Sequence, residues 1–275
     1  MSTRLRKIIY IVGLSHSGST ILDMLLTTAG KAVGLGQVWT VLREDPAHTR
    51  TRICSCGALA PECEVWGAVI DRLARLPDDA VQRDRYQVVL DVVGGLYGEE
   101  VAVVDSSKHA DYLAVLSEIP GVDLAVLHNM KDVRPFTIST LDNLARKGQG
   151  HPLPEKVFYQ WYRDNRASYA LAETLIGRAP VRVMYEGLCL STEAVTGRLA
   201  ESLGADYIDI GATLNHGRTH IIAGNRLRLP ESGKAKQLAY DYRWMVRSEW
   251  LRPYLLMPMV RKYNEQCLRE LGNVA

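Results

Sequence analysis

The chain lacks the features that mark several classes of protein. Its 275 residues carry a formal net charge of only +2, so no strong basic excess points to a nucleic-acid partner. The apolar run within residues 6–13 is far shorter than the roughly 20 residues that a membrane-spanning helix needs. It also lacks the small-residue cleavage site of a secretory signal. We therefore expect a soluble, cytoplasmic protein with no membrane span and no nucleic-acid partner.

Cysteines are few as well. There are five, and an odd number without a secretion signal argues against a disulfide framework. Three of them, Cys54, Cys56 and Cys63, lie in the segment CSCGALAPEC. Three thiols could bind zinc, but a structural zinc site needs four ligands, and His48 is a conceivable fourth only because it is near in sequence. A reduced loop or a local disulfide is the favoured interpretation, and we expect the function to require no metal.

The order of apolar segments predicts an α/β fold. Apolar runs predict strands at 6–13, 100–108, 121–132 and 179–186, and helical periodicity predicts helices at 20–29, 63–76, 84–97, 109–118, about 153–177 and 192–203. Strands that alternate with helices indicate a central, mainly parallel sheet flanked by helices. No repeat or linker divides the chain, so we expect one domain over 1–275, with an excursion at about 44–62 and C-terminal helices at about 234–272.

Polar residues follow three of the predicted strands. They are the segments 15–20, 105–109 and 131–132. In parallel sheets, ligands bind beyond the carboxyl ends of the strands. The sequence therefore predicts one site at that edge of the sheet.

The first of these segments has the spacing of a phosphate-binding P-loop without its lysine. Gly13 and Gly18 match G-x-x-x-x-G-K-[ST], but Ser19 stands at the lysine position, before Thr20. Backbone N–H groups and hydroxyls can still bind an anion, and His16 can add a positive charge or a neutral donor. Triphosphate chemistry is disfavoured because nothing replaces the lysine. A small-molecule kinase or nucleotide hydrolase with a degenerate P-loop remains the alternative, and a non-enzymatic nucleotide-binding protein is a third possibility.

The same stretch, GLSHSGSTILDMLL, resembles the 5′-phosphosulfate loop of the PAPS-dependent sulfotransferases of the bacterial type. In much of that family an arginine or lysine stands where this chain has His16. The resemblance extends over about residues 6–228. It implies a three-layer P-loop-type domain that transfers a sulfonyl group from 3′-phosphoadenosine 5′-phosphosulfate (PAPS) to a hydroxyl or amine of a small-molecule or glycan acceptor.

Other stretches resemble further parts of that family. The segment LHNMKDVRPFTIST places Lys131 and Ser139 at the spacing of the residues that hold the 3′-phosphate, with Arg134 as an alternative cation. VMYEGL resembles a segment whose tyrosine lies near the adenine, and HIIAGNRLR resembles a late loop that closes over the nucleotide. The implied nucleotide site comprises Ser15, His16, Ser17, Gly18, Ser19, Thr20, Lys131, Ser139, Tyr185, Gly224, Asn225, Arg226 and Arg228.

The catalytic residues are less defined. VVDSSKHADYL resembles the Asp-Ser-Ser-Lys segment of many bacterial members, and we expect Lys108 and His16 to neutralise charge on the leaving phosphate. Relatives often use a glutamate base where this chain has Gln37.

Several residues remain open as the base. His109 and Asp105 are the main candidates, and Glu44 is a more distant one. The acceptor and the oligomeric state stay open, although a homodimer is possible. The basic stretch 142–152 could meet an anionic or polyhydroxylated acceptor, but a solvated loop is favoured there.

Overall fold

The structure is a computed structural model that describes residues 6–43, 46–214, 217–230 and 236–270. Within these ranges six strands form one sheet in the order β5-β4-β1-β3-β2-β6, and every neighbouring pair is parallel. The strands are β1 (Arg6–Gly13), β2 (Ala32–Gly36), β3 (Ala102–Lys108), β4 (Val122–Met130), β5 (Val181–Met184) and β6 (Arg218–Thr219). All carboxyl ends therefore lie at one edge.

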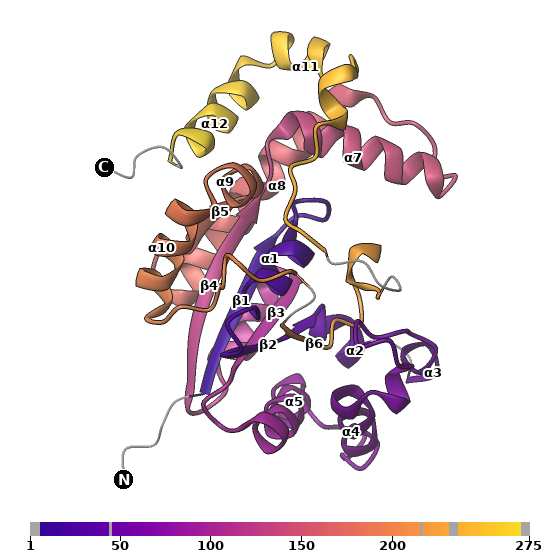
Figure 1. Cartoon of the computed structure of the whole chain (residues 1–275). Helices are drawn as coiled ribbons and strands as arrows, with labels where there is room; N and C mark the ends of the chain where they lie inside the picture. Colours follow the sequence, from indigo (N-terminus) through magenta and orange to yellow (C-terminus); the bar gives the residue numbers. More distant parts are fainter. Residues whose placement is uncertain (1–5, 44–45, 215–216, 231–235, 271–275) are drawn as a thin grey trace.

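The middle strand β1 is buried on both faces, which explains its unbroken apolar sequence. Successive side chains of a strand point to opposite faces. Ile8 and Tyr10 pack into one core with α4 (Glu64–Leu73), α5 (Gln82–Tyr97), α6 (Leu113–Ser117) and part of α8 (Pro154–Ile176). Ile9 and Ile11 pack into a second core with α1 (Ser19–Leu25), α9 (Tyr185–Leu190) and α10 (Thr192–Leu203). The predicted three-layer α/β class is confirmed (Figure 1).

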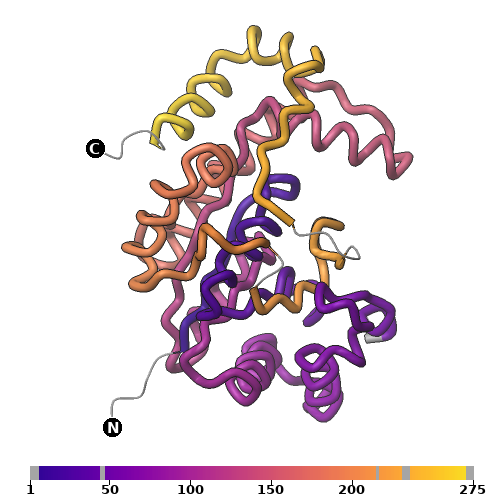
Figure 2. The backbone as a smooth tube through the Cα atoms, in the orientation of Figure 1, coloured from indigo at the N-terminus to yellow at the C-terminus, as the bar shows by residue number. Residues whose placement is uncertain are grey.

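The C-terminal part of the chain builds a third core at one end of the molecule. There α7 (Val133–Arg146) and α8 pack with α12 (Pro258–Arg269), and α11 (Leu251–Leu256) lies beside them. Figure 2 shows this yellow segment crossing above the end of the sheet. Helix α12 starts at Pro258, where a missing N–H costs no helical hydrogen bond.

Two strands, β2 and β6, were not predicted from the sequence. β2 is short and glycine-rich, and β6 has only two residues. Gly34 in β2 is required by packing, since a Cβ there would lie 2.3 Å from Asp23 Oδ1. The predicted strand 179–186 is also too long, because α9 already begins at Tyr185.

Part of the predicted loop at 44–62 is helical. The short helices not yet named are α2 (Val38–Arg43), α3 (Pro46–Arg50), η1 (Ala60–Glu62), η2 (Ala110–Tyr112), η3 (Arg226–Arg228), η4 (Arg243–Val246). Of the helices in the described ranges, none combines the length and apolar character needed to cross a bilayer.

Candidate active site

The turn after β1 is held against the next strand. Gly13 lies opposite Asn129 and has φ +145°, and a Cβ on it would stand 2.3 Å from the Asn129 carbonyl oxygen, so only glycine fits. The Asn129 side chain donates from Nδ2 to the Ser17 carbonyl at 2.7 Å. The turn ends at Gly18, which has φ 88° and precedes α1. These contacts fix the position of the turn relative to β4.

The hydroxyl groups of the turn differ in exposure. Ser17, Ser19 and Thr20 are buried, whereas Ser15 is exposed. The Ser17 hydroxyl is buried and has no protein partner. A buried hydroxyl without a partner costs free energy, roughly 1–3 kcal/mol, so it is a group that a bound ligand could satisfy.

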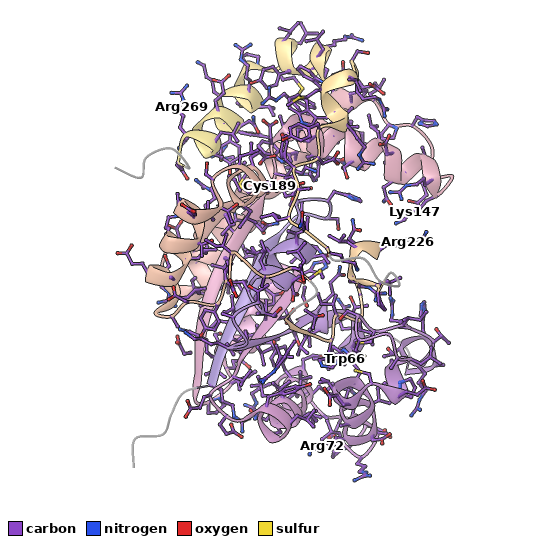
Figure 3. The ribbon with its side chains drawn as sticks, viewed as in Figure 1. Trp66, Arg72, Lys147, Cys189, Arg226 and Arg269 are labelled. Atoms are coloured by element: carbon purple, nitrogen blue, oxygen red, sulfur yellow. The ribbon has the colours of Figure 1, made fainter. Side chains whose placement is uncertain are left out.

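Positive charges from separate elements act on His16. Its pKa is lowered to about 4, first by burial and then by Lys147, Lys108, Lys131 and Arg146. Lys108 ends β3, Lys131 follows β4, and Arg146 is the last residue of α7. Lys147 follows it at the end of that helix (Figure 3). We call these five residues the cation pocket. At neutral pH its histidine is uncharged and can donate a hydrogen bond, while its four cations attract an anion.

Two residues of the cation pocket have a backbone conformation that side chains rarely adopt. His16 has φ 72° and Lys108 has φ 75°, and they are the only non-glycine residues with positive φ in the described part of the chain. Such conformations cost on the order of 1–3 kcal/mol and cluster at functional sites. Burial lowers the Lys108 pKa to about 8, and the carboxyls of Asp23 and Asp105 partly oppose this shift.

Tyr185 lies next to both predicted phosphate-binding elements, the turn at Gly18 and Lys131. A Cβ on Gly18 would lie 2.9 Å from its ring, and Lys131 Nζ lies 4.5 Å from the ring centroid. The Tyr185 hydroxyl donates to the Ala239 carbonyl at 3.0 Å and accepts from Asp241 N–H at 3.1 Å. The turn and Lys131 therefore contact one side chain from two directions.

The alternative cation, Arg134, is engaged elsewhere. Its guanidinium pairs with the Asp132 carboxylate, with Nε 3.0 Å from Oδ1, and lies 4.6 Å from the Trp244 ring centroid. Lys131 is thus the cation of the two that contacts Tyr185. Ser139 lies in α7 and is half-buried, so its predicted role at the 3′-phosphate stays a prediction.

The two ends of the segment 224–228 contact different parts of the molecule. Asn225 N–H donates to Thr20 Oγ1 at 3.2 Å, and a Cβ on Gly224 would stand 2.9 Å from the same oxygen. This start of the segment contacts the first turn of α1, and its predicted closure over the nucleotide stays a prediction. Arg226 is exposed, whereas Arg228 donates from Nη1 to the carbonyls of Ile53 and Ile221, the latter at 3.2 Å. Arg228 therefore holds the neighbouring loop, and its predicted contact with the nucleotide stays a prediction.

The candidate bases have different surroundings. Asp105 is fully buried and accepts from Tyr86 Oη at 3.1 Å and from the Ser107 N–H and hydroxyl, with a pKa raised by burial to about 6. These contacts favour a structural role. His109 is exposed next to Lys108, Gln37 is half-buried, and Glu44 lies outside the described residues.

Two buried carboxyls near the site were missed from the sequence. Asp23 in α1 accepts from Ser106 Oγ at 2.7 Å and from Gly36 N–H at 3.1 Å, and burial raises its pKa to about 8. Burial likewise raises the pKa of Glu186 to about 7. The signal for Asp23 was present, since a single acid interrupts the apolar run TILDMLL. Arg146 and Lys147 were also missed, because 142–152 was interpreted as a solvated loop.

Comparison with known proteins establishes the fold alone. No protein-family model and no curated protein sequence matches the chain. The sulfotransferase domain of the Synechococcus PCC 7002 olefin synthase is similar in structure, with a TM-score of 0.50 and 17% identity over 93% of this chain and 95% of that domain. The chain thus has the fold of that sulfotransferase domain.

Two other solved structures match less well. The sulfotransferase domain from the curacin biosynthetic pathway gives a TM-score of 0.45 at 17% identity, over 93% of this chain and 98% of that domain. Sulfotransferase STF9 from Mycobacterium avium gives 0.44 at 18% identity, over 95% of this chain and 76% of that one.

Proposed function

We propose that this protein transfers a sulfonyl group from PAPS to a hydroxyl or amine of a small-molecule or glycan acceptor. The observation that supports this most is the contact of Tyr185 with both Gly18 and Lys131. It brings a phosphate-type turn and a separate buried cation into one pocket. A nucleotide with an anionic group at each end of its ribose needs such a pair of sites.

The turn together with Lys108 and His16 suits the sulfonated end of the donor. The turn would take the 5′-phosphosulfate through its backbone N–H groups and through Ser17, whose hydroxyl lacks a protein partner. Lys131 would take the 3′-phosphate as a point charge. The segment that starts at Gly224 would cover the nucleotide from the side of Thr20.

The chemistry requires charge neutralisation on the leaving group. When the acceptor oxygen or nitrogen bonds to sulfur, the bond from sulfur to the bridging phosphate oxygen breaks, and negative charge grows on that phosphate. Lys108 and neutral His16 would be the donors to this phosphate, and preorganised donors of this kind typically contribute about 10²–10³-fold to the rate. Both residues have positive φ, a backbone conformation that clusters at functional sites.

His109 is the stronger candidate for the base. It is exposed and directly follows Lys108, whereas the carboxylate of Asp105 is buried against Tyr86 and Ser107. A base that removes the acceptor proton is worth about 10²–10⁴-fold. We expect His109→Ala to reduce the turnover number by that factor while the affinity for adenosine 3′,5′-bisphosphate stays unchanged.

Calorimetry followed by a transfer assay tests the proposal. Adenosine 3′,5′-bisphosphate should bind more tightly than ATP, with or without Mg²⁺, and labelled sulfonate should then move from PAPS to members of an acceptor library. Preferred binding of ATP with Mg²⁺ would point to phosphoryl transfer instead. Tight binding of the bisphosphate with no transfer to any acceptor would point to a non-enzymatic role.

A further inference from the structure

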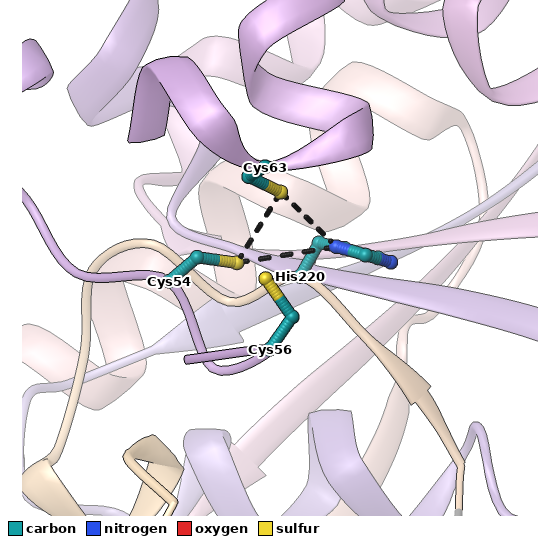
Figure 4. A group of neighbouring side chains, drawn as sticks. All are labelled: Cys54, Cys56, Cys63 and His220. Atoms are coloured by element: carbon teal, nitrogen blue, oxygen red, sulfur yellow. Dashed lines mark hydrogen bonds between the residues drawn. The ribbon is translucent and has the colours of Figure 1, made fainter. Parts of the chain in front are cut away.

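Three cysteines and a histidine from distant parts of the chain meet beside β6. The Sγ atoms of Cys54, Cys56 and Cys63 and a ring nitrogen of His220 all lie within 4.8 Å of one another. Figure 4 shows the four side chains pointing toward a common centre. Among the described residues the group includes His220, and the sequence-near His48 is not part of it. We call these four residues the cysteine–histidine cluster.

The spacing of the ligand atoms suits one tetrahedral metal ion. Zinc binds sulfur at about 2.3 Å and imidazole nitrogen at about 2.0–2.1 Å, which puts neighbouring ligand atoms roughly 3.5–3.8 Å apart. The Sγ atoms of Cys63 and Cys54 are 3.6 Å apart, and His220 Nδ1 lies 3.2 Å from Cys63 Sγ and 3.9 Å from Cys54 Sγ. These sulfurs are too far apart for a disulfide of about 2.05 Å, and all three thiols are free.

His220 is oriented for this task by its other nitrogen. Its Nε2 lies 2.9 Å from the Tyr97 hydroxyl and 3.4 Å from Glu64 Oε1, and Tyr97 also hydrogen-bonds to Glu64. The Trp66 indole donates to the His220 backbone carbonyl. Metal-ligating histidines commonly have such an outer partner, which fixes the ring and the tautomer. The buried Nδ1 is thereby left facing the sulfurs.

We propose that Cys54, Cys56, Cys63 and His220 bind one structural zinc ion. Three thiolates and one imidazole complete four-coordination, and a closed site of this kind is structural because no position remains for substrate. On binding, the thiols lose their protons to solvent. The ion joins a loop after α3 to the segment after β6, which are far apart in sequence.

This zinc ion would hold the base of the segment that contacts the first turn of α1. Ser55 Oγ donates to the Thr219 carbonyl at 2.8 Å and accepts from Ile221 N–H at 2.8 Å, so the two segments are already joined on either side of His220. The same segment continues to Asn225, which contacts Thr20. The metal therefore supports this segment without entering the chemistry.

Metal analysis of the purified full chain tests this inference. We expect one zinc per chain by elemental mass spectrometry, and one bound Co²⁺ with thiolate charge-transfer absorption when cobalt replaces zinc under reducing conditions. Cys56→Ser and His220→Ala should lose the stoichiometric metal. His48→Ala and Cys189→Ser are the matched controls and should retain it.

A milder variant keeps the test valid if ligand variants fail to fold. Glu64→Gln, at an exposed carboxylate, should weaken zinc affinity about 10- to 100-fold in competition with a chromophoric chelator. The inference is overturned if added Zn²⁺ does not bind, if peptide mass spectrometry finds a Cys54–Cys63 disulfide instead, or if His48→Ala removes the metal as His220→Ala does. None of these results depends on sulfonyl transfer, so they can fail independently of the proposed function.

Discussion

The cation pocket and the cysteine–histidine cluster both include a residue that directly follows a strand, yet they suit different ligands. The first suits an anion and the second suits a metal ion. The cation pocket gathers like charges around a neutral histidine, and an anion would stabilise that arrangement. The cysteine–histidine cluster gathers soft ligand atoms at the spacing of a single ion. One edge of a sheet can therefore offer a charged site for an exchangeable ligand and a closed site for a permanent one.

The largest expected effect is on the turnover number, when a cation of the cation pocket is removed. Lys108→Ala removes a cation from the pocket and should reduce sulfonyl transfer about 10²–10³-fold, because charge on the leaving phosphate is then less stabilised. Lys156→Ala, an exposed lysine at the start of α8, is the matched control. Initial rates at saturating donor measure the effect, and equal rates for the two variants would remove Lys108 from the chemistry.

The next largest effect should distinguish binding of the 3′-phosphate from binding of the 5′-phosphate. Lys131→Ala should weaken adenosine 3′,5′-bisphosphate binding roughly 10- to 150-fold, the value of a charged hydrogen bond of about 1.5–3 kcal/mol. The affinity for adenosine 5′-phosphate, which lacks the 3′-phosphate, should change little. Calorimetry with both ligands gives the comparison. A similar loss for both would mean that Lys131 serves the turn and not the 3′-phosphate.

The cation pocket should make nucleotide affinity fall as the pH rises through about 8, whereas zinc affinity at the cysteine–histidine cluster should rise with pH because the thiols must lose protons. The Lys108 pKa is lowered to about 8, so its charge disappears as the pH rises through that value, and bisphosphate affinity should then fall by at most about tenfold per pH unit. Lys108→Arg should flatten this profile, because a guanidinium stays charged. A profile that is unchanged in Lys108→Arg would assign the titration to another group.

The sequence predicted the phosphate-type turn, whose residues are neighbours in the chain, better than the cysteine–histidine cluster, whose residues are far apart in the chain. The turn at Gly13 and Gly18 could be found because its geometry depends on neighbouring residues. The cysteine–histidine cluster could not be completed, because His220 joins Cys63 only through the pairing of β6 with β2, and a two-residue strand leaves no periodic signal.

The cations at the end of α7 were missed for a similar reason. Nothing in 142–152 shows that Arg146 and Lys147 face His16 until α7 is positioned by its own core. The three-layer fold was predictable because buried strands and amphipathic helices alternate along the chain.

The last prediction concerns the pH dependence of folding stability that the buried carboxyl of Asp23 causes. The Asp23 carboxyl has a folded-state pKa of about 8, above its ordinary value of 3.8, so the folded state holds the proton more tightly and stability falls as the pH rises from about 4 to 8. Asp23→Asn should remove this loss, so the melting temperature of the variant should fall less between pH 5 and pH 8 than that of the parent chain. Thermal unfolding followed by circular dichroism measures it, and a parallel shift at both pH values would contradict the assignment.

A crystal structure with adenosine 3′,5′-bisphosphate tests the central claim most directly. We predict the 5′-phosphate at the N–H groups of residues 15–20 and the 3′-phosphate within hydrogen-bond distance of Lys131 Nζ, with Tyr185 between the two. Binding of the nucleotide at another surface, or with only one phosphate in this pocket, would contradict the account.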